Sequence, residues 1–271
     1  MTTAAFRENV VVLTGASAGI GREMAHQLAG QGAWLALAAR EPERLEAVAE
    51  ECRMMGGRAI AVPTDVGDQA QCAALVQRAV DEFGRVDTLI NNAGIGMWAP
   101  FDEVSDLSVF ERIMRINYLG SLFCTHYVLP HLKRTRGRIV GIGSLTAKTG
   151  VPTRSGYAAS KHAMAGFFDS IRIELDGTGV TVTMVHPGFV ATEIRERAFG
   201  ADGKPLGHGN SPVRESEVMT AETCARITLD AAARRKREVV MTGRAKLGMW
   251  LKLLSPGTVD RMARNAIEKG K

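Results

Sequence analysis

The segment TGASAGIG, Thr14 to Gly21, directly follows the apolar run NVVVL and constrains the fold of this chain more than any other feature. A strand that enters a glycine-rich turn and continues into a helix brings backbone N–H groups to a point where a pyrophosphate can bind. Gly15 suits the tight turn, Gly19 the approach of backbone to phosphate, and Gly21 a close contact between helix and strand. The spacing is G-x-x-x-G-x-G rather than G-x-G-x-x-G, and such a turn alone is also an ordinary loop.

Apolar runs and helical patterns alternate along the rest of the chain. Further strands are expected in AWLALAA, RAIAVPTDV, VDTLINNAG, GRIVGIGS, VTVTMVHPG and EVVMTG, and helices in residues 20–31, 42–55, 72–83, 105–134 and 155–176 and from Thr220 onward. This alternation predicts an α/β chain with a single-domain, doubly wound Rossmann fold, whose seven-stranded, mostly parallel sheet carries helices on both faces. No linker or composition shift divides it, so we assign residues 1–243 to the Rossmann-type domain and 244–271 to a basic amphipathic C-terminal tail.

The composition argues against several classes of protein. With 271 residues, 45% of them apolar, the chain can bury a large core. The four cysteines and six histidines lack metal-ligand spacing, which predicts buried reduced thiols and no metal site. There is no apolar run of about 18 residues and no signal-like N-terminus, so a cytoplasmic location is expected. The net charge of +5 lies entirely in residues 244–271, which argues against a nucleic-acid groove on the body.

The end of the second expected strand bears on the choice of nucleotide. After a turn of this kind, an acidic residue about twenty positions further on binds a ribose 2′-hydroxyl, whereas an arginine accommodates a 2′-phosphate. Here Ala39 occupies the acidic position and Arg40 follows it. A guanidinium suits a dianionic phosphate, so this pattern favours NADP(H) over NAD(H). The alternative is a solvated arginine near the start of a helix.

A second pattern concerns proton transfer. Tyr157 and Lys161 are four residues apart on one face of an expected helix, and Ser144 ends the preceding strand. Tyrosine has a pKa of about 10 in water, so it exchanges protons at neutral pH only when its phenolate is stabilised. A lysine ammonium one turn away supplies that charge, and the Ser144 hydroxyl can hold a substrate oxygen. Alone, a Tyr-x-x-x-Lys pair is more often an ordinary helix surface.

Taken together, these motifs resemble the short-chain dehydrogenase/reductase family over essentially residues 8–243. The matching pieces in chain order are TGASAGIG, NNAG at 91–94, Asn117 in RINYLG, Ser144, YAASK at 157–161 and HPGFVATE at 186–193. The resemblance implies an NADP(H)-dependent oxidoreductase that interconverts a carbonyl and a secondary alcohol.

The resemblance also implies roles for individual residues. Tyr157 would be the general acid in reduction and the base in oxidation, and Lys161 would lower its pKa and hold the nicotinamide ribose. Ser144 would orient the substrate oxygen, and Asn117 would anchor a water in a proton relay. The implied cofactor contacts are Gly15, Ser17, Gly19, Ile20, Gly21, Arg40, Asp65, Val66, Asn92, Ala93, Gly94, Tyr157, Lys161, Pro187, Gly188, Val190 and Thr192.

Among these contacts, Asp65 resembles the family's adenine contact, and residues 92–94 resemble the segment that lines the adenosine-side ribose. Val190 and Thr192 would face the nicotinamide carboxamide. Simpler interpretations also exist. Asn117 could cap or bend a helix, Asp65 could close a turn, and Thr192 could be an N-cap.

The motifs do not specify the substrate, which loops above the strand ends select in this fold. Three segments should line that cleft, at 94–101, 145–156 and 189–216. Their apolar residues favour a hydrophobic ketone or secondary alcohol, although such residues also simply pack a loop; they are Met97, Trp98, Phe101, Leu145, Val151 and Phe189.

The tail carries Leu247, Trp250, Leu251 and Leu254 at helical spacing beside basic residues. Such a helix can lie in a membrane interface as a peripheral contact. We favour the simpler interpretation, in which the stripe packs on its own subunit or on a partner subunit. By analogy with the family, a homodimer or homotetramer would use the helices at 105–134 and 155–176.

Two other classes of function compete with the oxidoreductase. An NADPH-sensing binding module could use the same fold and act through a protein partner, but it has no need of Tyr157, Lys161, Ser144 and Asn117. A membrane-recruited scaffold could be built around the basic tail. Turnover of a small-molecule carbonyl substrate separates the enzyme from the sensing module. Deletion of residues 245–271 separates the scaffold, because loss of localisation with retained turnover would make the tail an anchor.

Overall fold

The computed structural model describes residues 5–207 and 218–268. One seven-stranded sheet runs in the order β3-β2-β1-β4-β5-β6-β7, and every neighbouring pair is parallel. The strands are β1 (Val10–Thr14), β2 (Trp34–Ala39), β3 (Arg58–Pro63), β4 (Thr88–Asn91), β5 (Arg138–Ile142), β6 (Thr181–His186) and β7 (Glu238–Val240). The predicted fold class is confirmed.

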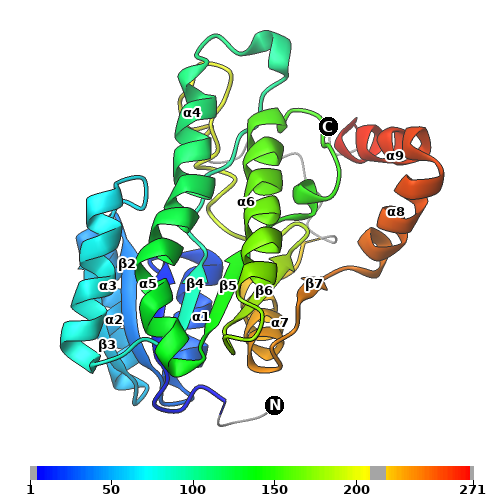
Figure 1. Cartoon of the computed structure of the whole chain (residues 1–271). Coiled ribbons are helices and arrows are strands. Elements are labelled where there is room, and N and C mark those ends of the chain that lie inside the picture. Colours follow the sequence, from blue (N-terminus) through cyan, green and yellow to red (C-terminus); the bar gives the residue numbers. More distant parts are fainter. Residues whose placement is uncertain (1–4, 208–217, 269–271) are drawn as a thin grey trace.

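Helices cover both faces of this sheet (Figure 1). They are α1 (Gly19–Ala29), α2 (Pro42–Met54), α3 (Gln69–Phe83), α4 (Ser108–Met114), α5 (Gly120–Thr135), α6 (Ser155–Glu174), α7 (Ala221–Ala233), α8 (Gly243–Leu254) and α9 (Pro256–Glu268). One apolar core joins the sheet to α1, α2 and α7, and a second joins it to α3, α5 and α6. The strand order reverses direction between β1 and β4, and this reversal opens a crevice at the carboxyl ends of the strands.

The long helix expected over 105–134 differs from the prediction. Helix α4 begins at Ser108, and a π-helical turn over Arg115–Leu119 separates it from α5. A π-turn inserts one residue into the helical repeat and changes the direction in which side chains leave the helix. Asn117 lies inside this turn and is fully buried. The π-helical interruption therefore sets the direction in which the buried Asn117 side chain leaves the helix.

The four cysteines are free and buried, as predicted. Cys52, Cys72, Cys124 and Cys224 lie in α2, α3, α5 and α7. Burial raises the pKa of the Cys52 and Cys224 thiols to about 12, so neither is ionised near neutral pH. Both behave as small apolar core residues.

Helices α8 and α9 follow β7 and pack against each other at one edge of the molecule (Figure 1). The expected stripe does not pack on its own chain, because the exposed fractions of Leu247, Trp250 and Leu254 are 71%, 71% and 86%. Only Leu251 of that stripe is partly buried. Among the described helices, none has the length and apolarity that crossing a bilayer requires.

Candidate active site

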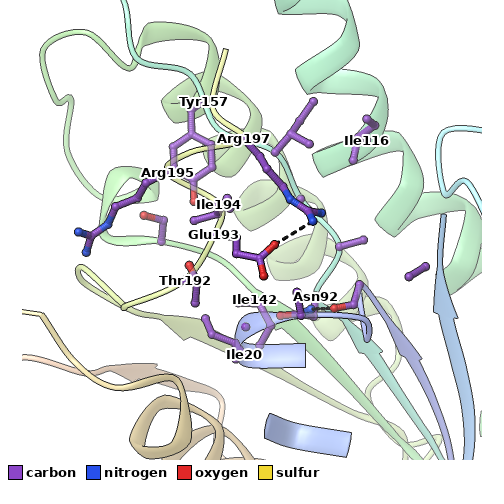
Figure 2. Close-up of a pocket in the computed structure, with 18 of the residues that line it drawn as sticks. Ile20, Asn92, Ile116, Ile142, Tyr157, Thr192, Glu193, Ile194, Arg195 and Arg197 are labelled. Carbon is purple, nitrogen blue, oxygen red and sulfur yellow. Dashed lines mark hydrogen bonds and ion pairs between the residues drawn. The ribbon is translucent and has the colours of Figure 1, made fainter. Parts of the chain in front are cut away.

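A cleft of about 670 Å³ lies across the carboxyl ends of the central strands. Figure 2 shows Tyr157 pointing into it, with Thr192 and Ile194 from the segment after β6 nearby. The predicted cofactor contacts that line the cleft are Gly15, Ser17, Gly19, Ile20, Arg40, Asp65, Val66, Asn92, Ala93, Gly94, Tyr157, Lys161, Pro187, Gly188, Val190 and Thr192. Ser144 lines it as well, whereas Gly21 and Asn117 lie behind this lining.

The glycine turn is locked against the end of β4. Gly15 has a φ of +66°, and a Cβ there would come within 2.8 Å of the Asn92 amide nitrogen. That amide donates hydrogen bonds of 2.9 and 3.0 Å to the carbonyl oxygens of Thr14 and Gly15. A Cβ on Gly21 would lie 2.0 Å from the Gly15 oxygen, so helix α1 contacts the turn itself rather than the strand. Substitution at either glycine would displace the turn.

Thr14 is a site residue that the sequence analysis did not identify. Its Oγ1 donates to the Ile90 oxygen and accepts hydrogen bonds of 3.0 Å from the N–H groups of Asn92 and Ala93. Thr14 ends β1, and these contacts fix the start of the segment that follows β4. The apolar pattern of the first strand does not predict these contacts, because the partners of Thr14 lie in and directly after β4, which is remote in the sequence.

The start of α1 faces the cleft without a side-chain cap. Its N-cap is Ala18, which makes no capping hydrogen bond, so the first N–H groups of the helix keep their hydrogen-bonding capacity. Gly19 has a φ of +54°, and a Cβ there would lie 2.9 Å from the Thr192 side chain. Uncapped N–H groups beside such a narrow gap suit an anionic group.

Asp65 closes a turn, as the simpler of the two interpretations of the sequence predicts, and its place in the cleft leaves the adenine contact a prediction. It lines the cleft, and its carboxylate also accepts a hydrogen bond of 2.8 Å from the Gly67 N–H. The carboxylate therefore closes a turn. The neighbouring Val66 packs against the start of α5, where a Cβ on Gly120 would lie 2.8 Å from a Val66 methyl group.

Arg40 lies at the rim of the cleft, beside an ion-pair cluster of Glu41, Arg44, Glu193 and Arg197. Arg44 donates hydrogen bonds of 2.7 and 3.1 Å to the two carboxylate oxygens of Glu193, and this contact lowers the pKa of Glu193. The cluster links the start of α2 to the segment after β6 across the cleft. Thr192 starts no helix there, so the N-cap interpretation is wrong.

Asn117 reaches the segment after β4 from the π-helical turn. Its Oδ1 accepts a hydrogen bond of 2.8 Å from the Ile95 N–H, and its Nδ2 donates to the Ile95 oxygen at 3.0 Å and to the Ser160 hydroxyl at 2.9 Å. The main-chain oxygen of Asn117 accepts a hydrogen bond from the Ser121 hydroxyl. Asn117 thus joins the wall of the cleft to α6.

Tyr157 projects from the first turn of α6, and burial raises the pKa of its hydroxyl. The positive charge of Arg154 and a hydrogen bond with the Ser144 side chain lower that pKa in turn. Ser144 is fixed from its own segment, because its hydroxyl accepts a hydrogen bond of 3.2 Å from the Thr146 N–H. The hydroxyl groups of Tyr157 and Ser144 are therefore hydrogen-bonded to each other in the lining of the cleft.

Lys161 lies one turn further along α6 and is 3% exposed. Its Nζ lies 5.8 Å from the centre of the Tyr157 ring and donates a hydrogen bond of 2.7 Å to the Ile142 oxygen. Burial lowers the pKa of Lys161 to about 8. Among the described residues, the positive charge that acts on Tyr157 is that of Arg154, which the sequence analysis did not identify.

The expected apolar lining is only partly correct. Phe189 lines the cleft, and Met97 and Trp98 border a small recess beside it. Phe101 is 66% exposed and packs edge-on against Phe110, outside the cleft. Leu145 and Val151 do not line the cleft in the described chain, and residues 208–216 of the third predicted segment lie outside the described residues.

A doubly wound sheet, a glycine turn at its reversal point and a group of Ser144 with the buried Tyr157 and Lys161 define a nucleotide-binding oxidoreductase of the Rossmann type. The model of the short chain dehydrogenase family matches residues 9–202. The chain belongs to this family, and the family assignment supports a nicotinamide cofactor.

Individual relatives agree with this assignment. The chain is 36% identical over 251 residues to "11-beta-hydroxysteroid dehydrogenase-like 4A" of Arabidopsis thaliana, covering 91% of this chain and 81% of the relative. It is 34% identical over 259 residues to "11-beta-hydroxysteroid dehydrogenase A" of Sesamum indicum, covering 94% and 74%. A short-chain dehydrogenase/reductase from Burkholderia phymatum in complex with NAD superposes with a TM-score of 0.81 at 25% identity, covering 94% of this chain and 96% of that one.

Proposed function

We propose that this protein is an NADP(H)-dependent oxidoreductase that interconverts a carbonyl and a secondary alcohol, with Tyr157 as the general acid and base. The observation that carries the proposal is the position of the Tyr157 hydroxyl. This hydroxyl makes a hydrogen bond with Ser144 in the same cleft that the glycine turn lines. Substrate and cofactor would meet at this point.

The residues present fit a dinucleotide. The uncapped start of α1 and the narrow gap at Gly19 suit a pyrophosphate, and Asp65 and Asn92, which line the same cleft, would face the adenosine. Arg40 offers a guanidinium at the rim, where a 2′-phosphate would lie. Glu41 is the nearby acid, but it is paired with Arg44 and Arg197, which favours NADP(H) over NAD(H).

The proton chemistry follows from the surroundings of Tyr157. In reduction, its hydroxyl donates a proton to the substrate oxygen while Ser144 holds that oxygen through a second hydrogen bond. The positive charge of Arg154 stabilises the phenolate that remains, and Lys161, whose Nζ lies 5.8 Å from the centre of the Tyr157 ring, is a second cation on the same helix. Asn117 positions the Ile95 segment and α6 around the reaction. The bound nicotinamide supplies the hydride in reduction and accepts it in oxidation.

An apolar substrate body suits the rest of the cleft. Its apolar lining near Tyr157 comprises Ile95, Phe189, Ile194 and Phe199. The hydroxysteroid dehydrogenase names of the relatives agree with an apolar carbonyl or alcohol. In a cell that keeps NADPH reduced, the reaction would run toward carbonyl reduction.

The exposed apolar face of α8 supports a peripheral membrane contact for a cytoplasmic protein. Leu247, Trp250 and Leu254 are exposed, and Lys246, Arg261 and Arg264 are exposed on the same helix pair. One tryptophan with a few leucines and basic residues binds a bilayer weakly and reversibly. Alternatively, a second copy of the chain could pack on this face. The homodimer or homotetramer stays a prediction.

Oxidation of NADPH in the presence of a panel of ketones and aldehydes tests the function, with NADH as the competing cofactor. We expect turnover with NADPH and a loss of at least about 1000-fold in kcat for Tyr157→Phe, because the variant lacks the transferable proton. Tight NADPH binding without turnover of any carbonyl compound would favour the NADPH-sensing module instead.

A further inference from the structure

A small recess opens beside Tyr157 and is bordered by two arginines. Its volume is about 40 Å³, and its walls include Met97, Trp98, Arg154, Tyr157, Ile194 and Arg195. Arg154, Tyr157 and Arg195 also line the main cleft, so the recess is a side pocket of the site and not a separate cavity. A group bound there would lie next to the Tyr157 side chain.

Aromatic rings hold the two guanidinium groups in place. The central carbon of the Arg154 guanidinium lies 3.9 Å from the centre of the Trp98 ring and 5.5 Å from that of Phe189. The corresponding carbon of Arg195 lies 5.7 Å from the centre of the Phe189 ring. Stacking occupies the faces of the Arg154 guanidinium and leaves the N–H donors at its edge available. Arg195 already donates a hydrogen bond of 3.3 Å to the Val190 oxygen.

Arg154 lacks a counter-charge in the described part of the chain. Its side chain makes no hydrogen bond or ion pair there, and its Nε is covered from solvent without an acceptor. The nearest acidic cluster does not supply one, since Glu193 is paired with Arg44 and Arg197. The pKa of Arg154 is lowered to about 10, mainly by burial; the Tyr157 phenolate opposes this shift and the charge of Arg195 adds to it. Stacking on Trp98 offsets only part of the cost of burying this cation.

We propose that the recess binds a carboxylate of the substrate, with Arg154 as its principal partner. The inference rests on the proposed carbonyl–alcohol activity and names a subclass of its substrates: compounds with an apolar body, a ketone or secondary alcohol, and an acidic group within a few bonds of it. A planar carboxylate accepts two parallel hydrogen bonds from a guanidinium, and this satisfies the donors of Arg154. The small volume of the recess favours this group over a bulkier phosphate ester.

The test compares acids with matched neutral esters. The probes are oxododecanoic acids that place the ketone at increasing distance from the carboxylate, each beside its methyl ester. Binding is measured by titration calorimetry on the NADP⁺-bound protein, which cannot reduce the ketone, and turnover by oxidation of NADPH. For the best-placed ketone, we expect the wild type to bind and reduce the acid about 10- to 100-fold better than the ester. Arg154→Gln should bring the acid-to-ester ratio to about one in both binding and turnover, while the loss of its charge beside Tyr157 lowers the turnover of acid and ester alike.

Two further variants separate recognition from folding. Arg154→Lys keeps the charge but not the paired donors, so it should show an intermediate preference for the acid. Arg58→Gln is the matched control, because Arg58 stacks on Trp34 at 4.5 Å far from the cleft, and it should keep the full preference. The inference is overturned if the wild type treats acid and ester alike, or if Arg154→Gln leaves the acid-to-ester ratio of the wild type unchanged. A binding preference for the acid without any NADPH oxidation would instead contradict the proposed function and leave the carboxylate site in place.

Discussion

The Nζ of Lys161 donates a 2.7 Å hydrogen bond to the carbonyl oxygen of Ile142, the last residue of β5. This contact ties α6 to the sheet at the point where Tyr157 enters the cleft. It also buries an ammonium group without a carboxylate partner among the described residues. A cation held in this way supports catalysis at a cost in stability, and the cost can be measured.

Lys161→Met should therefore stabilise the cofactor-free protein while abolishing turnover. Because burial lowers the pKa of Lys161 from 10.5 to about 8, we expect a gain of about 1–3 kcal/mol in the free energy of unfolding near neutral pH, reduced by the lost hydrogen bond. Between about pH 8 and 10.5 Lys161 is more protonated in the unfolded chain than in the folded one. The free energy of unfolding of the wild type therefore rises with pH over this range, and its difference from that of Lys161→Met becomes smaller.

Urea unfolding across this pH range measures the effect. Lys133→Met on α5 is the control, since Lys133 is exposed and its removal should change stability by less than about 0.5 kcal/mol. A variant that is less stable than the wild type at neutral pH would show that the hydrogen bond to Ile142 outweighs the cost of burying the charge.

Two glycine-to-alanine substitutions should have opposite effects. At Gly21 a Cβ would lie 2.0 Å from the Gly15 oxygen, so Gly21→Ala should cost at least about 2 kcal/mol and weaken cofactor binding. At Gly166, in the exposed face of α6, a Cβ meets nothing within 4 Å, and alanine should add about 0.5–1 kcal/mol. Thermal unfolding of the pair measures both changes, and equal effects would mean that the turn accommodates a side chain by shifting.

The ion pair between Arg44 and Glu193 should tune cofactor selectivity more than stability. Both side chains are more than a third exposed, so Glu193→Gln should change the free energy of unfolding by less than about 1 kcal/mol. Removal of the Glu193 carboxylate takes a negative charge from the lining of the cleft that also contains Arg40, so NADPH, with its 2′-phosphate, should bind about threefold more tightly and NADH unchanged. Added salt should reduce the gain.

Fluorescence titration with both cofactors checks this expectation. Glu46→Gln is the control, because Glu46 pairs with Arg53 at 2.6 Å outside the cleft. Weaker binding of both cofactors to Glu193→Gln would mean that the ion pair holds the segment after β6 in a binding-competent position.

The exposed face of α8 should carry the protein to anionic vesicles at low salt. Co-sedimentation of the wild type with phosphatidylserine-containing liposomes should be lost when Leu247 and Trp250 are both replaced by serine, with turnover retained. Ile173→Ser is the control, since Ile173 is 72% exposed on α6, away from the tail. If the wild type stays in the supernatant with liposomes, and analytical ultracentrifugation without liposomes shows a dimer, the exposed face of α8 would be assigned to a second copy of the chain.

The sequence by itself determined the fold class, and it named most of the predicted contact residues that the structure brings to the lining of one cleft. Strict alternation of strands and helices leaves few topologies, and the turn at Gly15 and Gly19 must meet the crevice because it ends the first strand. The order of the motifs along the chain also predicted that Ser144, Tyr157 and Lys161 act together, and all three line the cleft. The helical register of the tail identified the stripe of Leu247 and Trp250, though not its exposure.

Only the tertiary structure decided which charges act on which groups. Arg154 precedes Tyr157 by three residues, but its effect depends on Trp98 and Phe189, which arrive from other segments and desolvate it. The π-helical turn at Asn117 and the pairing of Glu193 with Arg44, far away in sequence, are equally invisible in local patterns. Periodicity reports which face of an element is buried, whereas electrostatics depends on distance and burial, and both are set by packing between elements remote in the chain.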